Sequence, residues 1–360
     1  MIYHIFYPLS EKFFIFNVTK YITFRGGCAF ITSFLIIMLL WKFTLKRLKR
    51  LKIVERVDMY GHIHLESLHG GKKGTPTMGG ILIIAAITAS SLLWARLDNP
   101  FTWLALFVML SLGVLGLYDD LLKIKKDKGL SRRQKLLWQS LIGIVFGALI
   151  VVNKNLDSTM SLPFFKKAII DLGYFYVFWA ALMVVATSNA VNFTDGLDGL
   201  AIGALIGNSL IFGIISYIVG NVKFANYLFL PYVENCGELT VICFSLMGAG
   251  LGFLWFNSYP AQVFMGDVGA LALGGLIGAI ALMIKQEFLL FISGGLFVAE
   301  ALSVILQMFS VKYRGKKLFK AAPLHHHFQV LGWEEPKITI RLWVVSIICG
   351  VVALLTLKLR

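Results

Sequence analysis

Long apolar stretches alternate with short polar segments along most of the 360-residue chain. Ten of these stretches are about 17–25 residues long, which is the length that an α-helix needs to cross the hydrocarbon core of a bilayer. The pattern predicts an all-α, polytopic integral membrane protein that forms a single domain over residues 1–360. The predicted spans are residues 21–43, 78–97, 101–118, 136–152, 172–190, 197–219, 239–256, 268–284, 288–311 and 338–357.

Basic residues gather in three of the segments between predicted spans. Residues 42–73, 119–135 and 311–337 hold 22 of the 34 lysines and arginines. Positive charge marks the cytoplasmic side of membrane helices, and ten spans put all three segments on that side. Both termini are then expected on the outer, periplasmic side. A shift of this frame by one span would move at least one basic segment outside.

The overall composition supports the same class. The chain is 58% hydrophobic with a mean hydropathy of +0.78, which does not describe a soluble domain. A net charge of +15 would suggest nucleic acid as the partner of a soluble protein. Here topology explains the cations, and we expect no nucleic acid. The four cysteines match no zinc or redox spacing. Residues 1–20 are too broken to span, so we expect them along an interface, without a removable signal peptide.

Two adjacent acids, Asp119 and Asp120, stand where an apolar run meets a basic segment. Carboxylates are scarce, with 19 Asp and Glu in the chain, and close carboxylates repel unless a cation lies between them. One hypothesis is a divalent metal and phosphate site at the membrane surface. The other is a solvated helix end on which the acids pair with Lys123 and Lys125. These residues alone leave both hypotheses open.

With ten spans, four other polar segments lie on the cytoplasmic side together with Asp119 and Asp120. They are residues 74–80, 189–199, 257–269 and 325–327. Ordinary solvated loops would be expected on both sides of the membrane, so the position of these segments on one side favours a shared function. The second segment reads NAVNFTDGLDG, and its glycines allow backbone N–H groups to approach an anion. Its polar side chains suit a nucleotide or metal site. The alternative is a set of helix caps, although the polar content exceeds what a cap needs.

Asp267 is the only acid in residues 257–269 and stands at the start of the eighth predicted span. The helix dipole stabilises a carboxylate there, so a purely structural role is one explanation. If Asp267 meets Asp119 and Asp120 across the bundle, the three form an Mg²⁺ site, because hard oxygen ligands suit this ion. Phe264 is a candidate to stack on a base, although a lone Phe is more often a core or lipid contact.

Three consecutive histidines, residues 325–327, lie in the last basic segment. Neighbours on a helix differ by about 100°, so the three cannot all face one metal. Phosphate or sugar contacts, or proton transfer, are therefore favoured over zinc. Residues 74–80 follow Lys72 and form a glycine-rich turn that lacks the P-loop pattern. Glu300 lies inside the ninth predicted span, and the sequence assigns it no role.

These segments together resemble the phospho-N-acetylmuramoyl-pentapeptide transferase family, within the polyprenyl-phosphate N-acetylhexosamine-1-phosphate transferase superfamily. The resemblance covers essentially the whole chain, and no motif position departs from the family pattern. The histidine triplet resembles this branch rather than its N-acetylglucosaminyl relatives. The motifs are GTPTMGG at 74–80, the Asp119-Asp120 pair with Lys123, NAVNFTDGLDG at 189–199, FMGDVG at 264–269 and PLHHH at 323–327.

The resemblance implies transfer of phospho-MurNAc-pentapeptide from its UDP carrier to undecaprenyl phosphate, giving lipid I and UMP, in the first membrane step of peptidoglycan synthesis. It places the active site on the cytoplasmic face of a multi-pass protein of the bacterial inner membrane. It also implies a homodimer in the lipid bilayer and Mg²⁺ as cofactor, with Asp267 as the direct ligand and Asp119 and Asp120 close by. Asp119 is the candidate to deprotonate or orient the lipid phosphate.

The resemblance also implies which residues act. The catalytic residues are Asp119, Asp120, Asp267, His325 and His326. The substrate-binding residues are Lys72, Thr75, Lys123, Asn189, Asn192, Asp195, Gly196, Asp198, Asn257, Phe264 and His327, with Phe264 stacking on uracil.

Two mechanisms remain open. Either the lipid phosphate attacks the β-phosphate directly, or an aspartate first forms a covalent phospho-sugar intermediate. Direct attack is favoured because the lipid phosphate is already an anionic nucleophile and needs only positioning. A sister transferase that uses UDP-N-acetylglucosamine is a second function, against which the histidine triplet argues. A transporter or channel is a third, but its ionisable residues should lie at mid-membrane, where Glu300 is the main candidate.

Overall fold

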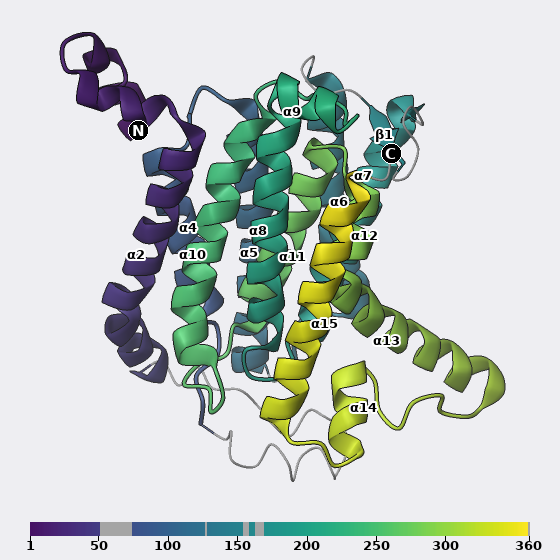
Figure 1. Cartoon of the computed structure of the whole chain (residues 1–360). Helices are drawn as coiled ribbons and strands as arrows, with labels where there is room; N and C mark the ends of the chain where they lie inside the picture. The colour runs from purple at the N-terminus through teal and green to yellow at the C-terminus, as the bar shows by residue number, and fades with distance from the viewer. Residues whose placement is uncertain (51–73, 127, 154–157, 163–168, 359–360) are drawn as a thin grey trace.

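The computed structural model describes residues 1–50, 74–126, 128–153, 158–162 and 169–358. These residues form a bundle of long helices (Figure 1). The long elements are α2 (Ile22–Arg50), α4 (Gly80–Trp94), α5 (Pro100–Lys126), α6 (Arg132–Val152), α7 (Tyr176–Thr194), α8 (Leu200–Val219), α10 (Leu239–Asn257), α11 (Gly266–Met283), α13 (Gly295–Arg314) and α15 (Glu335–Thr356). The shorter helices are α1 (Ile2–Phe6), α9 (Val222–Tyr227), α12 (Glu287–Ser293) and α14 (Leu324–Val330), with 3₁₀ turns at Pro8–Glu11, Phe14–Lys20, Gly173–Phe175 and Cys236–Glu238.

The prediction of an all-α, polytopic membrane protein is confirmed. Nine helices of the described residues are long and apolar enough to cross a membrane. The remaining predicted span, residues 78–97, corresponds to α4, which is a shorter apolar helix of 15 residues. The chain between α6 and α7 contains a small β-sheet that was not predicted from the sequence. There β1 (Thr159–Ser161) pairs with β2 (Ile169–Asp171) in a small antiparallel sheet.

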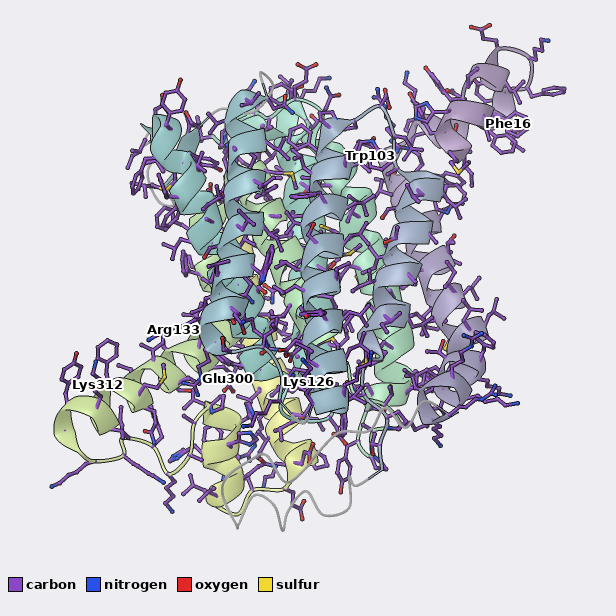
Figure 2. All side chains as sticks on the ribbon, turned by 180° about the vertical axis from the view of Figure 1, so that it is seen from behind. Phe16, Trp103, Lys126, Arg133, Glu300 and Lys312 are labelled. Carbon is purple, nitrogen blue, oxygen red and sulfur yellow. The ribbon has the colours of Figure 1, made fainter. Side chains whose placement is uncertain are left out.

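The two termini lie at the same end of the bundle (Figure 1). Figure 2 places Phe16 and Trp103 near this end, and Lys126 and Arg133 at the opposite end. An even number of spans, as predicted, likewise puts both termini on one side of the membrane. That the termini face the periplasm stays a prediction.

The ninth predicted span, residues 288–311, is not one continuous helix. It is divided at Gly294 into α12 and α13. Two adjacent glycines, Gly294 and Gly295, follow Ser293 at the break, and glycine and serine pairs are common causes of sharp helix kinks. Beyond it α13 leaves the bundle at a steep angle (Figure 1). Only 22% of its most apolar stretch is buried.

Helix α11 lies at the centre of the bundle, and every residue from Val268 to Met283 is buried. Its small residues allow neighbouring backbones to approach closely, as in other membrane helix pairs. A Cβ added at Gly80 of α4 would overlap the backbone of Gly269, and one added at Gly116 of α5 would overlap the carbonyl of Asp267. These close approaches fix the first turn of α11 against α4 and α5.

A buried ion pair joins helices at the end of the bundle that holds the termini. Arg25 of α2 donates to both carboxylate oxygens of Glu238, over 2.6 and 2.5 Å. The two side chains are 1% and 5% exposed. The backbone N–H of Arg96 adds a third hydrogen bond to Glu238 at 3.1 Å. A bidentate pair of this kind compensates the desolvation of both charges only while both partners are present.

Candidate active site

Asp119 and Asp120 lie inside α5 rather than beyond its end. The helix continues to Lys126, so the two acids occupy its penultimate turns. Their exposed fractions are 1% and 5%. The hypothesis of a solvated helix end is therefore wrong about exposure, because neither carboxylate faces water, but the pairing with Lys123 that it included is found. Buried carboxylates need cations or hydrogen-bond donors, and the neighbouring elements supply both.

One ammonium group lies among three carboxylates. Lys123 Nζ is 2.9 Å from Asp119 Oδ2, 3.2 Å from Asp120 Oδ1 and 2.8 Å from Asp267 Oδ2. Asp119, Asp120 and Lys123 come from the same helix, in (i, i+4) and (i, i+3) spacing, while Asp267 comes from the first turn of α11. The predicted meeting of the three acids across the bundle is thus found in the structure.

Lys135 completes the cluster, although the sequence did not lead us to expect it there. Its Nζ lies 3.1 Å from Asp119 Oδ2 and 2.6 Å from Asp267 Oδ2. It stands in the first turns of α6, which begins with a capping box between Ser131 and Gln134. The backbone N–H of Leu130, just before the cap, donates to Asp119 Oδ1 at 2.6 Å. The Ser-x-x-Gln signature in the sequence predicts this helix start, and it was the available signal for Lys135.

The cluster has the composition of a site for a hard divalent cation and for phosphate. Oxygen atoms of Asp119, Asp120 and Asp267 lie within 4.8 Å of one another. All three ligands are carboxylate oxygens, which Mg²⁺ prefers. The position of Lys123 Nζ shows that a positive charge is accommodated between them. Three formal negative charges face two ammonium groups, so the residues present fit the predicted ion.

Two further contacts orient the carboxylates. The side-chain amide of Asn192 on α7 donates to Asp267 Oδ1 at 2.8 Å. The backbone N–H of Val268 donates to Asp120 Oδ2 at 3.3 Å. The three helices that carry the acids and Asn192 are thereby tied together at one point. By contrast, Asn189 is directed to α6, where its amide donates to Gln139 Oε1 at 2.7 Å.

Two glycine-containing loops pair beside the carboxylates. The backbone N–H of Phe264 donates to the carbonyl of Pro76 at 2.8 Å, and those of Gly79 and Gly80 donate to the carbonyls of Phe264 and Met265 at 2.9 Å each. Phe264 and Thr75 are both half-buried in this arrangement. Lys72, the other predicted residue of this segment, lies outside the described residues.

Asp198 and Asn257 connect loops through backbone groups. Asp198 Oδ2 accepts from the N–H of Ala261 at 2.9 Å. Asn257 accepts from the N–H of Gly199 at 3.1 Å and donates to the carbonyl of Val263 at 2.7 Å. Glu335 accepts from the N–H of Asp198 at 2.8 Å, a contact that the sequence did not suggest. These side chains therefore hold the loop after α7 against the loop before α11.

The three histidines diverge, as the geometry of a helix requires. On α14, His325 Nδ1 lies 3.1 Å from Glu300 Oε2, and His326 Nδ1 lies 2.8 Å from Gln329 Oε1. His327 Nδ1 accepts from the N–H of Lys320 at 3.1 Å. The ring of His325 packs against Gly196, where an added Cβ would overlap its Nε2. Asp195 is the C-cap residue of α7, directly before this contact.

Known proteins match the chain over its full length. The family model for glycosyl transferase family 4 matches residues 102–285, and phospho-N-acetylmuramoyl-pentapeptide-transferase signature 1 matches residues 72–84. Curated proteins named phospho-N-acetylmuramoyl-pentapeptide-transferase are similar to it in Desulfotalea psychrophila (50% identical), Citrifermentans bemidjiense (48%) and Geobacter sp. strain M21 (48%). In each case the match covers 100% of both chains.

Proposed function

This chain belongs to the phospho-N-acetylmuramoyl-pentapeptide transferase family, and from that membership we propose how its residues act. It is a multi-pass protein of the bacterial inner membrane. It transfers phospho-MurNAc-pentapeptide to a lipid carrier and forms lipid I. In our proposal the donor is UDP-MurNAc-pentapeptide, the carrier is undecaprenyl phosphate, and UMP is released on the cytoplasmic side.

The observation that carries the proposal is the meeting of Asp119, Asp120 and Asp267 around one cationic position. Transfer of a phosphoryl group needs charge neutralisation and alignment more than covalent chemistry. When bound, Mg²⁺ would neutralise charge on the diphosphate of the donor. Asp267 is the proposed direct ligand, since Asn192 already orients its carboxylate. Asp119 and Asp120 complete the ligand set.

The lysines contribute a second source of positive charge. Lys123 and Lys135 reach Asp267 from two different helices, so both ammonium groups lie beside the proposed metal ligand. We assign both to contacts with the phosphates. Each can donate three hydrogen bonds, and donors fixed before the reaction stabilise charge as it develops.

We propose direct attack by the lipid phosphate. An oxygen of the lipid phosphate forms a bond to the β-phosphorus, the bond from that phosphorus to the bridging oxygen breaks, and UMP leaves with the bonding electrons. Asp119 is poorly placed to be a covalent nucleophile. Its Oδ1 accepts from Leu130 N–H, and its Oδ2 faces the ammonium groups of Lys123 and Lys135. It suits the orientation of the lipid phosphate instead.

The uridine and sugar-peptide parts would occupy the loops beside the carboxylates. Phe264, which is half-exposed, is the proposed stacking partner of uracil. The other proposed contacts are Lys72, Thr75, Asn189, Asp195, Gly196 and the three histidines. Asp198 and Asn257 would shape the pocket through the backbone contacts that they make. We further propose that two copies of the chain form a homodimer in the bilayer.

The proposal is tested by UMP release from UDP-MurNAc-pentapeptide by purified protein with undecaprenyl phosphate and Mg²⁺. Wild type should release UMP only with the lipid present. Asp267→Asn, which keeps the size of the side chain, should remain folded and lose release. Release that survives in this variant would refute the metal assignment. No release by folded wild type with this donor would refute the proposed reaction.

A further inference from the structure

Glu300 and His325 form a buried pair outside the carboxylate cluster. Glu300 Oε2 lies 3.1 Å from His325 Nδ1 and 3.4 Å from the backbone N of the same residue. Both side chains have an exposed fraction of 0%. Glu300 belongs to α13, and Figure 2 places it at the same end of the bundle as Lys126 and Arg133. An ionisable side chain buried in such a helix is costly and calls for a function or a specific partner.

The second ring nitrogen of His325 has no such bond. His325 Nε2 is buried and has no hydrogen-bond partner among the described residues. A buried polar atom without a partner is destabilising and uncommon in native structures, so it calls for an explanation. A ligand that bonds this nitrogen during the reaction is such an explanation.

The direction of Nε2 identifies the side from which a ligand would come. Nε2 points at Gly196, in the loop that directly follows α7, and any Cβ at this position would overlap it. One turn earlier on the same helix, Asn192 donates to Asp267 Oδ1. Glycine at position 196 thus puts no side chain against the buried Nε2, and Asn192 on the preceding helix links this region to the carboxylate cluster.

We propose that Glu300 is a positioning residue that accepts the Nδ1–H of His325 and so presents Nε2 to the nucleotide-sugar donor beside Gly196. This inference rests on the proposed function. The hydrogen bond at one ring nitrogen decides which nitrogen carries the proton and fixes the orientation of the ring. With Nδ1–H held by the carboxylate, Nε2 is the nitrogen with a lone pair, and it accepts a hydrogen bond from an O–H or N–H group of the donor.

A purely structural role of Glu300 would have different consequences for stability and turnover. Glu300 also faces the backbone N of His325, in the first turn of α14, and a loss of that contact would only weaken the attachment of α14 to α13. Such a loss would lower stability, and its effect on turnover would add to that of a change at His325. A positioning role predicts instead that the two changes act as one unit, so that the double variant is no worse than the single His325 variant.

The test combines kinetics with a spectroscopic measurement. Glu300→Gln keeps the shape of the side chain and should lower kcat about 10- to 100-fold. His325→Gln should lower it at least as much, and the double variant should equal His325→Gln. His325→Asn replaces it if that variant does not fold. Ser303→Ala is the matched control, because Ser303 is buried on the same helix and its hydroxyl donates to the backbone carbonyl of Glu300 rather than to the carboxylate.

Histidine ¹⁵N NMR of the full-length protein reads the tautomer without any substrate. Nδ1 of His325 should carry the proton in wild type and lose this preference in Glu300→Gln. Gly196→Ala should displace the ring of His325 from the position in which Nε2 meets the donor and lower turnover, because the added Cβ would overlap Nε2. A proton on Nε2 in wild type, additive kinetic losses, or full turnover in Gly196→Ala would each overturn the inference. Absence of UMP release by wild type would instead remove the proposed function, while the NMR result would still stand.

Discussion

Lys123 Nζ lies 2.8 Å from Asp267 Oδ2, although 144 positions separate the two residues along the chain. The contact places a fixed positive charge in the position where a divalent cation would be attracted. The ammonium of Lys123 and a divalent cation are therefore expected to compete for the same three carboxylates. The Mg²⁺ requirement of a Lys123 variant measures this competition.

Lys123→Met should have opposite effects on metal binding and on turnover. Without this ammonium, the three carboxylates repel one another more strongly, so a divalent cation is bound more tightly. The Mg²⁺ concentration for half-maximal UMP release should fall, while kcat falls about 10²-fold because a phosphate contact is lost. Lys125→Gln is the matched control, since this lysine is exposed on the same helix. A higher Mg²⁺ requirement would show that Lys123 is needed to hold the carboxylates in place.

Gly116→Ala should impair the active site through packing alone. The added methyl group would lie 2.6 Å from the carbonyl carbon of Asp267 and 2.7 Å from Val268 Cα, so α5 and α11 must separate. Displacement of a reacting group by about 1 Å can cost 10²-fold in rate. We expect a comparable loss of UMP release and a lower melting temperature. Gly207→Ala, on α8, should change neither, because no heavy atom of the described residues lies within 4 Å of the added carbon.

Direct attack predicts that UMP release depends on the acceptor even in a single turnover. Enzyme mixed with UDP-MurNAc-pentapeptide and Mg²⁺, without lipid, should release no rapid burst of UMP. A covalent phospho-sugar aspartate would instead release UMP in an amount equal to the enzyme before lipid is added. Rapid quenching and quantification of UMP distinguish the two. The hydrogen bond and ion pairs that engage both oxygens of Asp119 are the reason for expecting no burst.

Glu238→Gln should destabilise the protein without touching the active site. It leaves the guanidinium of Arg25, 1% exposed, without its charged partner. Breaking a buried pair in this way costs about 3–5 kcal/mol. Asp98→Asn is the comparison, because the Arg96–Asp98 pair is 34% and 49% exposed, and exposed pairs contribute about 0–1 kcal/mol. Thermal unfolding in detergent should show a clear decrease for the first variant only; equal shifts would contradict the assigned role of the pair.

The sequence was sufficient to place Asp119, Asp120 and Asp267 on one side of the membrane, whereas their meeting was implied by the family resemblance. Asp119 and Asp120 follow the third predicted span, and Asp267 precedes the eighth. Counting the spans places both positions on the cytoplasmic side. This placement needs only the length of a membrane helix and the distribution of basic residues. It does not show that α5 and α11 are neighbours, which the contact between the acids requires.

Other parts of the site could not be predicted in this way. The apolar run at residues 288–311 gives no sign in hydropathy of the break at Gly294, which depends on how α12 and α13 pack. Lys135 was interpreted only as part of a basic loop, because its partner Asp267 is 132 positions away. The side chains of Asp198 and Asn257 bind backbone groups of a distant loop, and backbone groups have no signature in the sequence.

The complete burial of α11 has a consequence for the protein in different membranes. Since no residue from Val268 to Met283 is exposed, lipid tails have no surface of this helix to press on. A bilayer that is thicker or thinner than the apolar length of the protein strains the outer helices first, by tilt or local deformation. The helix that carries Asp267 is shielded from that strain by its neighbours. Asp267 should therefore keep its position within the bundle when the thickness of the membrane changes.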